Sequence, residues 1–151
     1  MAGDGQGAER KLAEARELAG MLEDRTTDRR PWSYWMMPRW FQCQRGVAFG
    51  YLAGDPRYRD MAVNELGAGY AGLPEDYQLS EAAAEYLVHL ADVHVRAGDA
   101  GQACDVVQQA AEIARLTGSV QLRITLTGLH VQMAARWPDD PRVTDLADAL
   151  R

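Results

Sequence analysis

Apolar residues recur every three or four positions along most of the chain, which is the spacing of a helix with one buried face. The first such stretch predicts a helix over about residues 8–22, behind a glycine-rich start, residues 1–7, that we expect to be disordered. The polar run "EDRTTDRR" has no period and ends at Pro31, so it is predicted to be a loop. No segment alternates with the period of two that marks a strand. The pattern therefore predicts an all-α protein.

Prolines and capping residues indicate where the later helices begin. Pro38 opens a helix expected over residues 38–53, because proline fits the first helical turn. Two Asp-Pro pairs each supply an N-cap and a first-turn proline. The first pair opens a helix at residue 55, and the second opens a short last helix at residue 140. Further helices are expected over about residues 80–97, 100–117 and 119–136. The expected total is about six or seven helices.

The two helices around Gly98 follow the residue spacing of a tetratricopeptide repeat. The residues that set this spacing are Leu87, Leu90, Ala91 and His94, then Ala103, Val107 and Ala110. Small residues where two helices cross let the axes approach, and large residues interlock beside the crossing. One hairpin cannot bury its own apolar face, so a second is expected around the "GDP" turn that starts at Gly54. We therefore expect one tetratricopeptide-like domain over residues 8–151.

Three segments together resemble a known family. They are "RPWSYW", "LPEDY" and "YLVHLADVHVRAGDAGQACDVVQQAAEIARLTGSVQLR", and they extend over about residues 30–136. In this succession the chain resembles the C-terminal tetratricopeptide-like domains of bacterial helix-turn-helix regulators of the phage-repressor-like class. The resemblance implies a sensory or partner-binding module. It does not extend to a DNA-binding domain, because only about 30 residues precede the aromatic run.

The charge and the absence of apolar runs exclude several classes of protein. The chain has a formal net charge of −6 and a single lysine, Lys11, which counts against nucleic-acid binding because phosphates attract a basic surface. It has no long apolar segment and no signal-peptide pattern, so we expect a cytoplasmic protein that has no contact with a membrane. A helix-turn-helix interpretation of Gln108–Leu129 is weak, since Arg115 and Arg123 are its only basic residues.

No motif in the sequence indicates catalysis or a cofactor. The three histidines lack the four-residue spacing of helical metal ligands, and no nucleophile motif or phosphate-binding loop is present. Cys43 and Cys104 are far apart in the sequence and are expected to be reduced and buried. We therefore expect no metal and no cofactor, and an enzyme remains only a third alternative.

Two groups of residues are candidates for binding. Glu85, His89, Asp92 and Arg96 are spaced by four, three and four residues, so they share one face of a helix. By the resemblance, this face would line the concave surface of the repeat array, although a solvated face without function explains the same spacing. The second group is the aromatic run and its arginines: Trp32, Tyr34, Trp35, Arg39, Trp40, Arg45 and Tyr51.

The aromatic run has two interpretations. Trp32, Tyr34 and Trp35 could cap the open end of the array, where their burial would contribute several kcal/mol at roughly 25 cal/mol per Å². Alternatively, the rings with Arg39 and Arg45 form a pocket for a carboxylate or a flat ring. The first functional hypothesis is thus a regulatory module that binds a protein or peptide, and the second is a small-molecule-binding accessory protein. A homodimer is left open.

Overall fold

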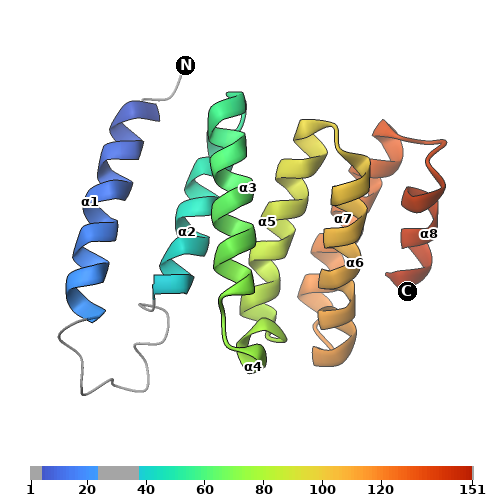
Figure 1. Cartoon of the computed structure of the whole chain (residues 1–151). Coiled ribbons are helices and arrows are strands. Elements are labelled where there is room, and N and C mark those ends of the chain that lie inside the picture. The colour runs from blue at the N-terminus through green and yellow to red at the C-terminus, as the bar shows by residue number, and fades with distance from the viewer. Residues whose placement is uncertain (1–4, 24–37, 151) are drawn as a thin grey trace. The chain divides into compact units, whose positions relative to one another are not determined.

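The computed structural model describes residues 5–150 apart from 24–37, with the backbone alone for residues 22 and 23. The regular structure in this part of the chain is entirely α-helical, which confirms the all-α prediction. Eight helices are described here (Figure 1), one more than expected, because the turn before Ser80 contains the short helix α4, Glu75–Gln78. None of the described helices is long and apolar enough to cross a membrane.

The chain divides by its internal contacts into two compact units, one ending at Leu73 and one beginning at Pro74. The first unit holds α1 (Gly5–Glu23), α2 (Pro38–Tyr51) and α3 (Pro56–Ala71). The second holds α4, α5 (Glu81–Ala97), α6 (Ala100–Thr117), α7 (Val120–Arg136) and α8 (Pro141–Ala149). The single domain expected over residues 8–151 stays a prediction.

The helix α1 begins at Gly5, so the expectation of disorder over residues 1–7 is wrong for its last three residues. The reason is a tertiary contact: Gly5 lies so close to Tyr58 of α3 that an added Cβ would be 2.5 Å from the Tyr58 hydroxyl oxygen. Glycine, which weakens an isolated helix, here lets the first turn of α1 approach α3.

Glycines also set the packing of α2 against α3 in the first unit. An added Cβ on Gly46 would be 2.6 Å from Cγ of Leu66, and one on Gly69 would be 2.7 Å from Sγ of Cys43. Cys43, Leu66 and Phe49 are almost fully buried at this contact. The two helices are therefore close enough that one residue in each contact has to lack a side chain.

In the second unit, several of the fully buried residues of α5 and α6 are alanines. Ala83, Ala84 and Ala91 on α5 are fully buried, as are Ala103 and Ala110 on α6. The helix α5 packs against α6 and α7, α6 also packs against α7 and α8, and α7 packs against α8. Small residues at the contact of α5 and α6, with Leu87 and Val107 buried beside them, agree with the spacing found in the sequence.

The helix ends follow local capping chemistry at the predicted residues. The Asp55 and Asp140 carboxylates accept from the backbone N–H groups of Arg57 and Arg142, at 2.9 and 3.0 Å. Gly98 and Gly118 end α5 and α6 in the left-handed conformation, with φ of 84° and 67°. The helix α2 stops at Tyr51, before the predicted residue 53, because the next two residues form tight turn hydrogen bonds to Phe49 and Gly50.

Candidate binding sites

The structure separates the members of the aromatic run. Trp32, Tyr34 and Trp35 lie outside the described residues, so their role as a cap or a pocket wall stays a prediction. Trp40 is 3% exposed and belongs to the core of the first unit, whereas Tyr51 is 78% exposed. These two rings therefore do not form one pocket wall, because one is buried and the other faces solvent.

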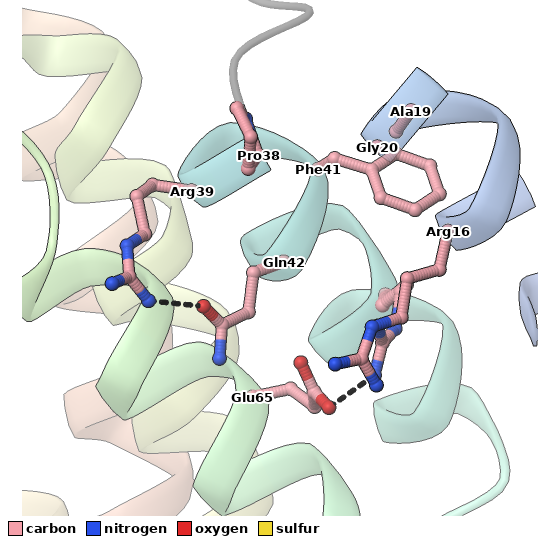
Figure 2. Close-up of a pocket in the computed structure, with 9 residues that line it drawn as sticks. Arg16, Ala19, Gly20, Pro38, Arg39, Phe41, Gln42 and Glu65 are labelled. Carbon is pink, nitrogen blue, oxygen red and sulfur yellow. Dashed lines mark hydrogen bonds and ion pairs between the residues drawn. The ribbon is translucent and has the colours of Figure 1, made fainter. Parts of the chain in front are cut away.

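The first unit contains a pocket between α1 and α2 with a volume of about 350 Å³. Its lining combines charged, polar and small residues with one ring: Arg16, Ala19, Gly20, Pro38, Arg39, Phe41, Gln42, Arg45 and Glu65. Figure 2 shows the side chains of Arg16 and Glu65 pointing into the same space, with the Phe41 ring turned toward Ala19 and Gly20 of α1. We call it the arginine pocket. The predicted Arg39 and Arg45 thus line one pocket, and its aromatic lining residue is Phe41, whose ring lies on the opposite side of α2 from the Arg39 side chain (Figure 2).

One of the three arginines in this pocket already has an anionic partner. Arg45 on α2 forms an ion pair with Glu65 on α3, and their side chains are only 12% and 19% exposed. Arg39 donates a hydrogen bond to Oε1 of Gln42 at 3.0 Å, and its guanidinium group lies over Gly72 at the end of α3. The Glu65 carboxylate therefore offsets Arg45, and it is the one carboxylate among the described residues that line the pocket.

The second unit contains a shallow groove of about 230 Å³ between α5 and α7. Glu81, Glu85, Val88 and His89 line it from α5, and Gln121, Leu122 and Thr125 line it from α7. We call it the acidic groove. At one end, the Ser119 hydroxyl, which precedes α7, donates a hydrogen bond to Oε1 of Glu81 at 2.5 Å. This bond ties the N-terminal ends of α5 and α7 together.

Half of the polar stripe predicted on α5 lies in this groove. Glu85 and His89 line it, whereas Asp92 and Arg96 pair with each other at 2.8 Å and are about two-fifths exposed. This ion pair joins residues four positions apart on one helix, and such a pair contributes only about 0.3–0.5 kcal/mol to stability. Glu81 and Glu85 are the carboxylates of the groove, and no lysine or arginine is among its described lining residues, so we call the groove acidic.

The solvent side of α7 carries exposed apolar residues. Val120, Ile124 and Val131 are 56–62% exposed and, at intervals of four and seven, lie on one face of the helix. The buried face of α7 holds Leu122, Leu126, Leu129 and Met133. We call Val120, Ile124 and Val131 the apolar stripe of α7.

The remaining groups considered are potential metal ligands, the two thiols and the arginines of the helix-turn-helix alternative. No group of three or more potential metal ligands occurs among them. Burial raises the pKa of the Cys43 thiol to about 12 and also raises the pKa of Cys104, so both free thiols are protonated near neutral pH. Arg115, one of the two basic residues of the helix-turn-helix alternative, forms an ion pair with Glu112 at 2.5 Å.

Several lining residues have no signal in the sequence. Arg16 and Glu65 are each one of several charged residues on α1 and α3, and only the packing of three helices brings them to one pocket. Gln121 and Thr125 could have been found, because the repeat pattern predicts that the first helices of successive hairpins are neighbours. No protein-family model, curated protein or solved structure matches the chain.

Proposed function

We propose that the protein is a regulatory interaction module of the tetratricopeptide type, which binds a basic amphipathic segment of a partner protein. The acidic groove is the observation that carries this proposal. It lies between the first helices of two consecutive hairpins, α5–α6 and α7–α8, where the family that the sequence resembles has its concave face. It also contains Glu85 and His89, which the spacing of polar residues selects independently of the structure.

The chemistry of the groove indicates what the segment carries. Glu81 and Glu85 attract a lysine or arginine, since a carboxylate and a cation form charge-assisted hydrogen bonds. Val88 and Leu122 contact the stem of such a side chain. The apolar stripe of α7 lies on the same helix as one groove wall, so a helical segment with an apolar face could cover it.

The proposal is tested by nuclear magnetic resonance with two designed probes of equal length, an amphipathic Leu/Lys helix and its Leu/Glu counterpart. The Leu/Lys peptide is expected to shift the amide signals of Glu85, His89 and Thr125, and the Leu/Glu peptide is not. Glu85→Gln should weaken binding by about fivefold, the effect of losing one partly exposed ion pair.

Asp105→Asn is the matched control, because Asp105 is an exposed carboxylate on α6 outside the groove residues. It removes the same charge from the same unit and should leave the affinity unchanged. Equal losses in Asp105→Asn and Glu85→Gln would mean that the peptide follows net charge alone, and the groove would then not be the site. Absence of shifts with either peptide would also contradict the proposal.

A further inference from the structure

The solvent side of α7 is uncharged over its whole length. The buried face of this helix includes Leu126 and Met133, and on another side Nε2 of His130 lies 2.8 Å from the Val143 carbonyl oxygen of α8. The side opposite the buried face consists of six exposed residues, which we call the outer face of α7: Val120, Ile124, Thr127, Gly128, Val131 and Ala135. None of these six residues carries a charge.

The middle of the outer face leaves room for a second helix. Gly128 has no heavy atom within 4 Å of an added Cβ, so a helix that approaches there meets no side chain of this protein. The neighbouring Thr127 hydroxyl donates a hydrogen bond to the Arg123 carbonyl oxygen at 2.8 Å. This bond lies within α7, so the hydroxyl keeps its partner when the face is covered. The face can therefore be buried without leaving this polar group unpaired.

The spacing of the outer face matches a second copy of the same helix. The intervals between its six residues are four, three, one, three and four, the same in both directions along the chain. In an antiparallel copy, related by a two-fold axis at the middle of the face, Val131 is therefore level with Ile124 of the first copy, and Ala135 is level with Val120. The two-fold axis repeats both contacts, and antiparallel helix dipoles attract each other.

The charge of the chain also favours this face as the contact between copies. Each copy has a formal net charge of −6, so two copies repel each other unless they meet where neither presents a charge. The outer face of α7 meets that condition. A partner that is selected by its charge would need a charged side chain on this face, and the six residues provide none.

We infer that the outer face of α7 is a self-association surface, on which the α7 of a second copy docks in the antiparallel direction. A contact made by one helix from each copy is at the low end of interface sizes, below roughly 1,200 Å², so the dimer is weak, with a Kd of about 100 µM. The inference goes beyond the proposed function, and the face shares no residue with the lining of the acidic groove.

Sedimentation of the full chain between about 10 µM and about 1 mM tests the inference. The average mass should rise from 16.7 kDa toward twice this value. Ile124→Glu should raise the Kd at least about tenfold, because the two-fold axis brings two unpaired carboxylates into the contact. Gln109→Glu is the matched control, since it adds the same charge at an exposed position of α6 and should leave the Kd unchanged.

The salt dependence separates the dimer from the peptide-binding proposal. Sodium chloride at about 0.5 M should strengthen the dimer, because it screens the repulsion between two acidic chains. The same salt should weaken binding of the Leu/Lys peptide to the acidic groove, because it screens an attraction. A monomer at about 1 mM, or equal effects of Ile124→Glu and Gln109→Glu, would overturn the inference. If the monomeric chain lost the Leu/Lys peptide on Ile124→Glu, the face would belong to the partner segment instead.

Cross-linking tests the antiparallel direction. An equimolar mixture of Ile124→Cys and Val131→Cys chains should form a disulfide-linked dimer on oxidation with diamide. Either variant alone should not, because equivalent residues of antiparallel copies would be about 10 Å apart along the helix axis, beyond the roughly 7 Å that a disulfide spans between Cα atoms. The wild type is the control, since Cys43 and Cys104 are only 0% and 4% exposed. Stronger cross-linking in a single variant than in the mixture would contradict the antiparallel contact.

Discussion

Gly46 and Gly69 occupy the positions where α2 and α3 leave no space for a side chain. Around Gly69 the neighbours of an added Cβ are Sγ and the backbone nitrogen of Cys43, at 2.7 and 2.9 Å. A backbone atom cannot turn aside as a flexible side chain can, so any larger residue has to separate the helices. Gly67, on the same helix, has no heavy atom within 4 Å of an added Cβ.

The substitution Gly69→Ala is therefore expected to destabilise the protein, and Gly67→Ala is not. Overpacking a close contact costs about 1–3 kcal/mol, whereas alanine replacing glycine in a helix contributes up to about 1 kcal/mol of stability. Urea denaturation of both variants measures the difference. If Gly69→Ala were as stable as Gly67→Ala, the close approach of α2 and α3 would be wrong.

At the scale of elements, the α5–α6 hairpin depends on small residues at the contact of its helices. Ala91 is fully buried on α5, which packs against α6. Ala91→Trp should lower the free energy of unfolding by more than about 3 kcal/mol, because tryptophan exceeds the volume changes that typically cost 1–3 kcal/mol. The same substitution at Ala82, which is exposed on α5, is the control and should have little effect. Thermal melts followed by circular dichroism distinguish the two variants, and equal stability would remove the tetratricopeptide assignment.

Helices and their ends were predictable from the sequence to the extent that local chemistry determines them. Asp55, Gly98 and Gly118 end or begin helices through their own backbone and side-chain preferences, and the structure has each at the expected place. The start of α1 and the end of α2 were not, because a tertiary contact at Gly5 and turn hydrogen bonds after Tyr51 decide them. The helix α4 was missed because four residues are too few to show a period.

The residues of the candidate sites were also predictable only where spacing within one helix relates them. Glu85 and His89 were found because four-residue spacing on one helix places them on one face. Arg16, Arg39 and Glu65 come from three helices, and no spacing within the sequence relates them. Trp40 was assigned to a binding wall on its residue type, yet its ring is needed in the core, where an aromatic side chain contributes more by burial.

For the molecule as a whole, the total charge describes neither candidate site. A formal charge of −6 disfavours anionic ligands on average, but a bound anion responds to the charges within about one Debye length, roughly 8 Å at physiological ionic strength. Among the described lining residues, the arginine pocket has three arginines and one carboxylate, and the acidic groove has two carboxylates and no lysine or arginine. The described lining residues of the two sites therefore differ in the sign of their charge, although both sites belong to one acidic chain.

The stability of the whole chain should decrease as the pH falls through the range in which His94 is protonated. Burial of His94 lowers its pKa below the usual 6.5, and the Asp99 carboxylate opposes this only in part. Between the folded pKa and about 6.5, the unfolded chain therefore binds more protons than the folded chain, so protonation favours unfolding. The contribution of His94 to the free energy of unfolding is fully present above about pH 6.5 and is lost as the pH falls toward the folded pKa. Below the folded pKa, this contribution no longer changes with pH.

Melting temperatures of the wild type and of His94→Gln between about pH 8 and pH 5 test this. Glutamine does not titrate in this range, so the wild type should lose more stability than the variant on acidification, even if the variant starts from a lower value. The pKa values of the Glu112 and Asp140 carboxyl groups are lowered, so their contribution to the free energy of unfolding is lost only near and below about pH 4. This range lies outside the tested window, and both groups are present in both proteins. Parallel curves for the two proteins would show that the environment of His94 does not oppose its charge.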